Sequence, residues 1–159
     1  MIRGAKKEES EILTGISFTS KAYWNYPQDY FKIWKNELTL RPEYIEKNEV
    51  SVVEVEGTVA GYYSVVELCE DTKFSEILLQ RGFWLEHMFI LPRYIGQHLG
   101  TEMFEHLQTW CQLRGVKRLN ILADPNARGF YEKMGCVYQG EFPSSISQRT
   151  TPYLILLIK

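Results

Sequence analysis

A short loop between two glycines is the first place where this sequence could do chemistry. Trp84–Leu91 is almost wholly apolar, Pro92 breaks the run, and Gly96–Thr101 leads into residues with apolar side chains at helical spacing. This order predicts a buried strand, a loop and the N-terminus of a helix. Such a loop points backbone N–H groups and the positive end of the helix dipole at one place, which suits a phosphate. The spacing is neither a Walker A loop nor a dinucleotide fingerprint, so a turn that simply needs glycine is the alternative.

Glu86 is unusual because it places a carboxylate inside the apolar run. Burying an unpaired charge costs several kcal/mol, so we expect Glu86 to face either an opening or a partner. Alternation along a strand places Glu86 on the same face as Met88 and Ile90, with His87 on the opposite face. A buried ion pair without a chemical role is the alternative for either titratable side chain.

The elements that must position these residues alternate between helices and strands. In the first half of the chain, the pattern predicts a strand over residues 2–4, helices over Lys7–Thr19 and Pro27–Leu38, and a turn over Glu43–Lys47. A β-hairpin is predicted for Val50–Glu56 with Val59–Leu68. A loop is predicted over Cys69–Arg81, with a turn of helix around Ser75–Leu79. The second half predicts the strand before the glycine loop, helices over Glu102–Arg114 and Asn126–Met134, and strands over Arg118–Ala123, Val137–Phe142 and Tyr153–Lys159. A strand–helix–strand unit implies a parallel pair and the hairpins imply antiparallel strands, so we expect an α/β fold with a mixed sheet covered by helices.

Composition limits the class of protein. The 159 residues suffice for one domain with a real core, and we expect a single domain over residues 1–159. The formal net charge of −2 and the lack of a Lys/Arg run argue against a nucleic-acid partner. Three cysteines without a CxxC pair predict reduced thiols, no apolar leader opens the chain, and the terminal LILLI is too short to span a membrane. We therefore expect a soluble cytoplasmic protein without a membrane partner.

Two segments resemble motifs A and B of the GNAT superfamily of acyl-CoA-dependent N-acetyltransferases. The first is Met88–Phe104, where the family has an apolar strand, Arg/Gln-x-x-Gly-x-Gly/Ala and a helix. The second is Asp124–Gly135, which is similar to the family's Asn-x-x-Ala/Gly-x-x-Phe-Tyr-x-x-x-Gly-Phe segment. The resemblance covers nearly the whole chain and is most specific over residues 84–135. It implies a single GNAT-like domain, with a mostly antiparallel sheet and a central, splayed parallel strand pair.

The resemblance also implies a site for acetyl-CoA as co-substrate, with no metal. The pantetheine arm would lie where Leu85–Ile90 splays from Leu119–Ala123, pairing with the backbone at Met88 and Ile90, and the pyrophosphate would lie on Gly96–Thr101. The residues implied in cofactor binding are Met88, Phe89, Ile90, Ile95, Gly96, Gln97, His98, Leu99, Gly100, Thr101, Asn126, Gly129, Phe130 and Tyr131. Asn126 could instead be a helix cap.

Ile95 and His98 depart from the family pattern, which has Arg and Gly at these positions. If position 98 requires a positive φ, a side chain there costs about 1 kcal/mol, although His tolerates that region better than most residues do. The backbone N–H donors and the helix dipole do not depend on side-chain identity. These departures from the family pattern motivate the alternative of a non-catalytic module that binds CoA thioesters.

Tyr131 matches the family's tyrosine whose hydroxyl protonates the departing CoA thiolate; the alternative is a core aromatic with its hydroxyl at the rim. The acceptor ammonium must lose a proton, and Glu86, His87 or water alone could take it.

Four further residues could line the acceptor pocket, or form a core aromatic pair and a solvated loop: Trp24, Tyr26, Ser145 and Arg149. Cys136 has no nearby His and is interpreted as a core residue.

The sequence therefore predicts an N-acetyltransferase that moves an acetyl group from acetyl-CoA to a primary amine of a small-molecule or amino-acid-like acceptor. The amine would attack directly in a ternary complex, and the protein would be a monomer or homodimer. The alternative is a non-catalytic sensor or interaction module of the same fold that binds CoA thioesters. A small α/β domain that does not bind CoA is a more distant alternative.

Overall fold

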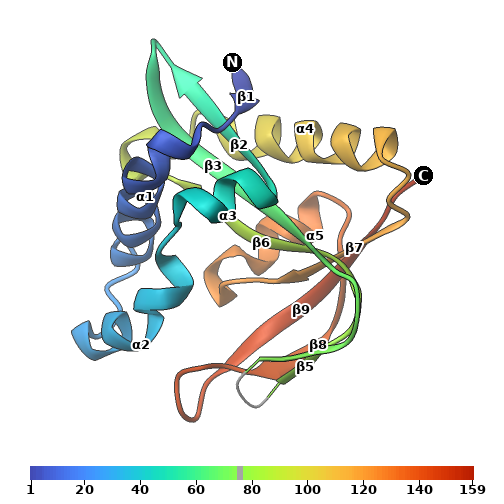
Figure 1. The fold of residues 1–159 in the computed structure, drawn as a ribbon. Coiled ribbons are helices and arrows are strands. Elements are labelled where there is room, and N and C mark those ends of the chain that lie inside the picture. Colours follow the sequence, from blue (N-terminus) through green and yellow to red (C-terminus); the bar gives the residue numbers. More distant parts are fainter. Residues whose placement is uncertain (75–76) are drawn as a thin grey trace. The chain divides into compact units, whose positions relative to one another are not determined.

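The computed structural model describes residues 1–74 and 77–159. The helices are α1 (Ser10–Ala22), α2 (Gln28–Leu38), α3 (Pro42–Lys47), α4 (Leu99–Leu113) and α5 (Arg128–Lys133), with 3₁₀ turns at Lys7–Glu9, Pro92–Tyr94 and Pro125–Ala127. The strands are β1 (Ile2–Gly4), β2 (Glu49–Val55), β3 (Thr58–Leu68), β4 (Thr72–Phe74), β5 (Ile77–Leu79), β6 (Gly82–Ile90), β7 (Arg118–Leu122), β8 (Val137–Pro143) and β9 (Thr150–Leu157). Figure 1 shows their course along the chain.

The strands form a mixed sheet. Within the described residues, the main sheet has the order β1-β2-β3-β6-β7-β9-β8. β6 pairs with β7 in parallel, whereas β1 with β2, β2 with β3, β7 with β9 and β8 with β9 are antiparallel. The predicted mixed sheet with one parallel pair is confirmed, because the strand–helix–strand segment through α4 supplies the crossover that a parallel pair requires.

The chain divides into two compact units. The first unit consists of residues 1–65 and 87–103, and the second consists of residues 66–86 and 104–159. All three boundaries fall inside continuous elements, namely β3, β6 and α4. Each unit is described below by itself.

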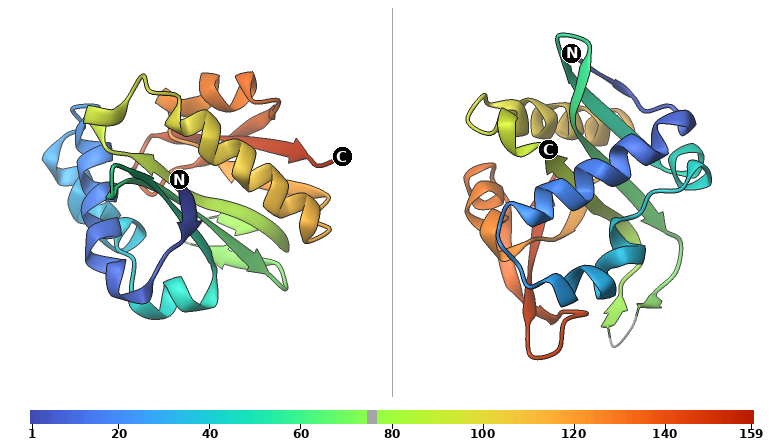
Figure 2. Two further views of the ribbon diagram at one scale, coloured as in Figure 1. Left: turned by 90° about the horizontal axis from the view of Figure 1, so that it is seen from above. Right: turned by 90° about the vertical axis from the view of Figure 1, so that its left-hand side faces the viewer.

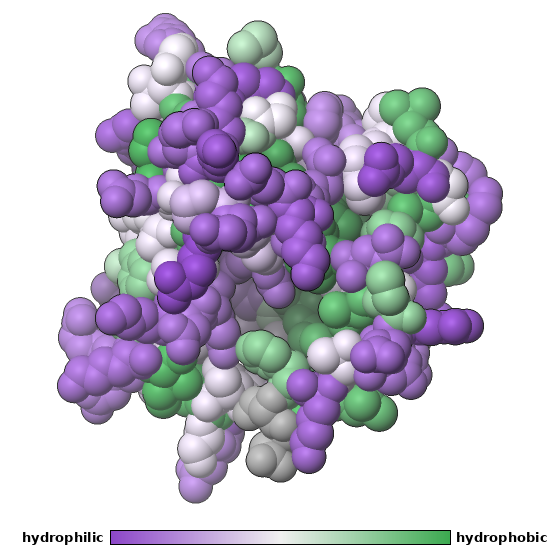
Figure 3. Space-filling model, in the orientation of Figure 1, coloured by the Kyte–Doolittle hydropathy of each residue, from purple (hydrophilic) through white to green (hydrophobic). Residues whose placement is uncertain are grey.

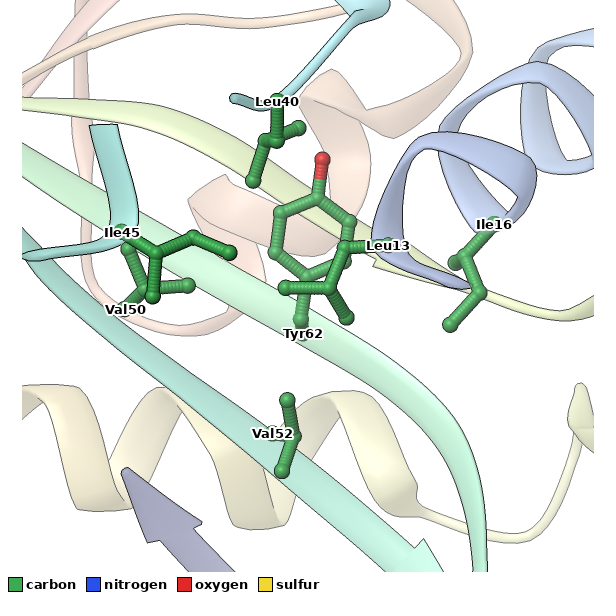
Figure 4. Close-up of a cluster of buried hydrophobic side chains, with 7 residues drawn as sticks. All are labelled: Leu13, Ile16, Leu40, Ile45, Val50, Val52 and Tyr62. Atoms are coloured by element: carbon green, nitrogen blue, oxygen red, sulfur yellow. The ribbon is translucent and has the colours of Figure 1, made fainter. Parts of the chain in front are cut away.

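The core of the first unit lies between two helices and one face of its strands. Leu13 and Ile16 of α1 and Ile45 of α3 pack with Val52 of β2 and Tyr62 of β3 (Figure 4). Leu40 and Val50 complete this cluster, and α1 and α3 lie on the same face of β2 and β3 (Figure 2). Hydrophilic side chains cover the outer side of this helical region, at the left of Figure 3. The helices thus bury their apolar stripe and expose their polar face.

The β2–β3 hairpin has a tight turn at Glu56 and Gly57. Glu56 has φ 50° and Gly57 has φ 78°, and two consecutive positive φ values are typical of the two-residue turn that matches strand twist. The predicted hairpin is therefore confirmed. Its register shifts between Val53 and Glu54, where β2 contains a bulge.

The core of the second unit forms around β7 and β9. Leu119, Ile121 and Leu154 are almost wholly buried, as are Phe104 and Leu107 from the part of α4 in this unit. Asn120 is a buried polar residue whose amide donates to the carbonyl of Phe83 at 3.0 Å, and its oxygen accepts from the hydroxyl of Tyr153 at 2.6 Å. The first bond joins β7 to β6 and the second joins β9 to β7, and together they satisfy a polar group that would otherwise be costly to bury.

One predicted element is wrong. The segment around Ser75–Leu79 was expected to contain a turn of helix, but Ile77–Leu79 is strand β5, which pairs with β4. The pairing places the apolar residues Phe74 and Ile77 opposite each other, and such cross-strand pairs stabilise a strand over a turn of helix. Residues 75 and 76 lie outside the described part.

The α4 helix starts at Leu99, slightly before the predicted Glu102, and α5 is preceded by a 3₁₀ turn where a continuous helix was expected. Over the described residues, no helix is long and apolar enough to cross a membrane.

Candidate active site

The glycine loop in the first unit has the conformation of a helix N-terminal anion site. Gly96 has φ 87°, and α4 begins at Leu99. The amide of Glu102 donates to the carbonyl of His98 at 3.1 Å, which is the start of the helical hydrogen-bond ladder. The N–H groups of residues 99–101 therefore lie in the first turn, where an α-helix offers donors without intrahelical partners. This arrangement fits a pyrophosphate, with donors and the helix dipole directed at one charge.

His98 has φ 63°, so position 98 does require the left-handed conformation. The family's glycine would adopt this conformation without steric cost, whereas the Cβ of His98 costs about 1 kcal/mol. A Cβ built on Gly96 would meet nothing within 4 Å, so the glycine at 96 is needed for its φ and not for space. Position 98 thus has the backbone conformation that favours glycine, although it carries a side chain.

The backbone of β6 next to the loop is anchored on one edge. The amide of Leu91 donates to the carbonyl of Ala60 at 2.8 Å, and a Cβ on Gly61 would lie 2.5 Å from the carbonyl oxygen of Phe89. Only glycine therefore permits this approach of β3 to β6. Backbone groups alternate along a strand, so those of Met88 and Ile90 point to the other edge.

The parallel pairing of β6 with β7 covers Phe83–Leu85 against Leu119–Ile121, while β6 itself continues to Ile90. The last residues of β6 therefore lie outside this pairing. The carbonyl of Ile90 accepts a hydrogen bond from the hydroxyl of Ser20 in α1. Met88 and Ile90 are the backbone positions at which the pantetheine arm was expected to pair.

Glu86 and His87 differ sharply in their surroundings. Glu86 is exposed, as expected for a carboxylate that faces an opening. His87 is only 6% exposed, and both of its ring nitrogens are engaged: Nδ1 with the hydroxyl of Ser64 and Nε2 with the carbonyl of Glu37, each at 2.8 Å. A general base needs an accessible lone pair, so this geometry disfavours His87 and leaves Glu86 and water as candidates.

Tyr131 lies in the second unit, on the short helix α5. Its ring packs against Phe130 and Phe104, with centroids 5.3 Å and 6.1 Å away, and the residue is 6% exposed. Burial, and to a smaller extent the neighbouring Cys136 and Asp124, raises the pKa of Tyr131 well above its usual range. The phenol is therefore neutral at physiological pH and holds a proton that it can donate.

Asp124, and not Asn126, is the cap of the segment that carries Tyr131. The carboxylate of Asp124 accepts from the backbone N–H of Asn126 at 2.8 Å and from its side-chain amide at 3.0 Å. The segment thus begins at Asp124 and Pro125, with a first turn that is 3₁₀. Gly129 and Phe130 follow on the same short segment, and Gly135 ends it with φ 99°.

The cysteines fit the interpretation of core thiols. Cys111 and Cys136 are buried and free, and Cys69 is exposed and free. Burial raises the pKa of Cys111 to about 11 and that of Cys136 to about 12. Neither buried thiol is a thiolate near neutral pH, which removes the nucleophilic form.

The four residues expected at the acceptor pocket fall in different units. Trp24 and Tyr26 lie in the first unit, between α1 and α2; Trp24 is 45% exposed, and the ring of Tyr26 packs edge-on against Trp34 at 5.0 Å. The ammonium of Lys21 lies 4.5 Å from the centroid of the Trp34 ring. Tyr26 thus belongs to an aromatic cluster that already holds a cation.

Ser145 and Arg149 lie in the second unit, on a loop that is tied by its own backbone. The amide of Ser144 donates to the carbonyl of Arg149 at 2.9 Å, and the amide of Arg149 donates to the carbonyl of Ile146 at 3.2 Å. Ile146 is buried, so this loop is packed and not simply solvated.

Several residues around these positions were not found from the sequence. Lys21, Ser20, Tyr44 and Ser64 engage residues far along the chain, such as Ser20 with Ile90 and Tyr44 with Ser64. No local pattern marks such pairs, because their spacing depends on how the strands are ordered. The sequence feature that could have indicated the polar residues around His87 is the histidine itself, because it lies inside an apolar run.

Comparison with known proteins decides the family. Residues 17–136 match the family described as the acetyltransferase (GNAT) family, which is well over half of the chain. The chain belongs to the GNAT acetyltransferase family. This GNAT protein has the motif-A loop and the motif-B tyrosine inside the matched range, so the resemblance inferred from the two motifs is confirmed.

Individual relatives are distant. A Bacillus subtilis (strain 168) protein, named as a candidate ribosomal protein bS18 alanine N-acetyltransferase, is 26% identical over 87 residues, which cover 53% of this chain and 50% of the relative. The match thus spans half the length of that curated relative.

Solved structures extend the likeness to the whole chain. A GCN5-related N-acetyltransferase of Rhodopseudomonas palustris superposes with a TM-score of 0.75 at 17% identity, covering 99% of this chain and 94% of the other. The PaiA N-acetyltransferase of Thermoplasma acidophilum, in complex with coenzyme A, gives 0.73 at 12% identity and covers 99% and 98%. At these identities the likeness confirms the predicted fold class alone.

Proposed function

We propose that this GNAT acetyltransferase moves an acetyl group from acetyl-CoA to a primary amine, which attacks the thioester directly. The observation that carries the proposal is Tyr131, whose buried phenol keeps its proton within the family's second motif. Acetyl transfer releases a thiolate, and a neutral phenol beside it can supply the proton that makes it a better leaving group.

Each remaining step of the reaction needs one group of the chain. Glu86, or water in its place, takes a proton from the acceptor ammonium so that the nitrogen can form the new C–N bond. The backbone N–H of Met88 donates to the carbonyl oxygen as negative charge develops there. Tyr131 gives its proton to the sulfur as the C–S bond breaks, the nitrogen gives up its second proton to solvent to become the neutral amide, and solvent returns a proton to the phenolate.

The loop at Gly96–Thr101 supplies the binding energy for the cofactor in this proposal. The donors of the first turn of α4 would hold the pyrophosphate, together with the backbone of Gln97 and His98. Met88 and Ile90 would hold the pantetheine arm through their backbone, with Phe89 between them. No group of three or more metal-ligating side chains occurs in the part of the chain that the structure describes, and the proposed chemistry uses none.

Two acceptor classes fit the proposed amine. The sequence favoured a small-molecule or amino-acid-like amine, with Trp24, Tyr26, Ser145 and Arg149 around it. The name of the B. subtilis relative instead points to an alanine of ribosomal protein bS18. Both acceptors present a primary amine, so the chemistry at Tyr131 is the same for both.

The Tyr131→Phe variant tests the acid. Loss of the phenolic proton is expected to lower kcat roughly 100- to 10,000-fold, the usual range for a general acid. The measurement is thiol release from acetyl-CoA over a full pH range, with Tyr138→Phe, a half-buried tyrosine in the same unit, as a matched control. Unchanged kcat in Tyr131→Phe across all pH values would rule out this role for Tyr131.

An acceptor screen separates the enzyme from the sensor module suggested by Ile95 and His98. Calorimetry with acetyl-CoA is run beside thiol release with small amines, free amino acids and a peptide beginning with the alanine of ribosomal protein bS18. Turnover with one class identifies the acceptor. Tight binding with no turnover for any amine would favour the sensor, and no binding at all would exclude both.

A further inference from the structure

His87 is the centre of a buried polar chain that the proposed reaction does not use. Its Nδ1 lies 2.8 Å from the hydroxyl of Ser64, which in turn lies 2.9 Å from the hydroxyl of Tyr44. Its Nε2 lies 2.8 Å from the carbonyl oxygen of Glu37. All four residues belong to the first unit.

The carbonyl fixes the direction of one hydrogen bond, and a neutral ring then fixes the direction of the others. A carbonyl oxygen can only accept, so Nε2 of His87 must carry the hydrogen and donate to Glu37. In a neutral imidazole Nδ1 is then the acceptor, and the hydroxyl of Ser64 donates to it. The oxygen of Ser64 is left to accept from the phenol of Tyr44. The chain therefore runs Tyr44, Ser64, His87, Glu37, and fixes one tautomer.

The surroundings favour the neutral ring. Ser64 is fully buried, and the rings of Tyr44, Tyr62 and Phe89 lie 5.8, 5.9 and 6.0 Å from the imidazole centroid. An imidazolium would lose its hydration among these rings. In the neutral Nε2–H tautomer, each ring nitrogen has a hydrogen-bond partner in the observed geometry.

The chain joins four elements at one residue of β6. Glu37 is in the last turn of α2, Tyr44 is in α3, Ser64 is in β3, and His87 stands between Glu86 and Met88 on β6. Because a C-terminal helical carbonyl lacks an intrahelical donor, the N–H of His87 also satisfies an end group of α2. His87 thus fixes the strand at the residue that separates the candidate base from the candidate oxyanion donor.

We propose that His87 is a positioning residue: its neutral imidazole, held as the Nε2–H tautomer between Ser64 and Glu37, fixes the β6 backbone that presents Met88. The expected kinetic effect of His87 rests on the proposed function. The tautomer of His87 rests on the geometry alone. A displacement of about 1 Å at reacting groups costs on the order of 100-fold in rate, so anchoring this backbone matters for acetyl transfer.

Paired substitutions test the positioning role. His87→Leu removes both hydrogen bonds and is expected to lower kcat/KM for acetyl-CoA roughly 10- to 100-fold, as supporting residues behind a site do. His87→Gln offers one amide N–H for Glu37 and one oxygen for Ser64, and is expected to recover most of that loss. The pH dependence of kcat/KM is expected to keep its wild-type shape in His87→Gln. If this variant instead loses the acidic limb of the profile, His87 is the base and the proposal is overturned.

A spectroscopic measurement tests the tautomer without any turnover. Long-range ¹⁵N–¹H correlation of the imidazole is expected to show the Nε2–H form at neutral pH, with Ser64→Ala changing the Nδ1 shift. An imidazolium or an Nδ1–H form at neutral pH would overturn the proposal. If no amine is acetylated, the proposed function fails, yet this spectrum and the calorimetric affinity of His87→Leu for acetyl-CoA still decide the role of His87.

Discussion

At the scale of single residues, backbone conformation explains more of the site than side-chain identity does. His98 is one of four non-glycine residues with a positive φ in the described part of the chain, the others being Asn25, Glu56 and Gln148. Each pays a steric cost that glycine would not pay. His98 lies in the loop proposed to hold the pyrophosphate. The loop has the backbone conformation of an anion site, although residue 98 is not the glycine of the family motif.

Replacing His98 by glycine is expected to raise the free energy of unfolding by about 0.5–1 kcal/mol, because the left-handed strain is relieved while the unfolded chain gains some freedom. Urea unfolding followed by circular dichroism measures the change. Gln148→Gly is the matched control, since φ is 66° there and the residue lies outside the phosphate loop. Stabilisation by Gln148→Gly with destabilisation by His98→Gly would mean that the His98 side chain has a stabilising contact that outweighs its strain.

At the scale of elements, local patterns predicted most of the fold. Alternation in Val50–Glu56 and Val59–Leu68 identified the β2–β3 hairpin, and the apolar stripe after Gly100 identified α4. The β4–β5 pair was missed because each strand has only three residues, and its apolar pairing, Phe74 with Ile77, becomes visible only in register. The chain from Tyr44 to His87 was missed for a related reason: it joins residues 43 positions apart, and no local period encodes that contact.

Arg3 ties the first elements of the chain together. Its guanidinium makes a bidentate pair with Glu9, with nitrogen–oxygen distances of 3.0 and 2.8 Å, and also binds Glu54 of β2. The hydrogen bonds from Arg3 lower the pKa of Glu9, and both carboxylates raise the pKa of Arg3. The side chains of Arg3 and Glu9 are 26% and 13% exposed, so solvent screens the pair only partly.

Glu9→Gln is expected to lower Tm at pH 7 and to have a progressively smaller effect as the pH falls below about 4, the ordinary range of a glutamate. The sign follows from the lowered pKa: ionised Glu9 stabilises the folded state above its unfolded pKa, and the stabilisation is lost as acid protonates the folded carboxylate. Thermal unfolding between pH 3 and 7 measures the difference. The exposed Glu8→Gln is the control, and an equal Tm loss at every pH would contradict a charge-based contribution.

At the scale of the whole molecule, we propose that residues 1–159 unfold as a single domain although they form two compact units. The argument is covalent and structural: β6 and α4 each run from one unit into the other without a break. A strand or helix interrupted at such a boundary would lose its own hydrogen bonds, so partial unfolding of one unit would damage elements of the other. The buried thiols offer a probe, since Cys111 and Cys136 lie in the second unit and the Leu13 core lies in the first.

Leu13→Ala is expected to destabilise the first unit by roughly 2–5 kcal/mol through a cavity at a fully buried position. If the units unfold together, thiol labelling of Cys111 in the second unit should accelerate by roughly 30-fold or more, since each 1.4 kcal/mol is a tenfold change in the open population. Labelling with an aromatic disulfide at neutral pH measures this, with Cys69 reacting at once in every variant because it is exposed. Ile12→Ala on the same helix is the control, as Ile12 is 53% exposed. An unchanged labelling rate of Cys111 in Leu13→Ala, with loss of helical signal at lower urea, would show that the two units unfold independently.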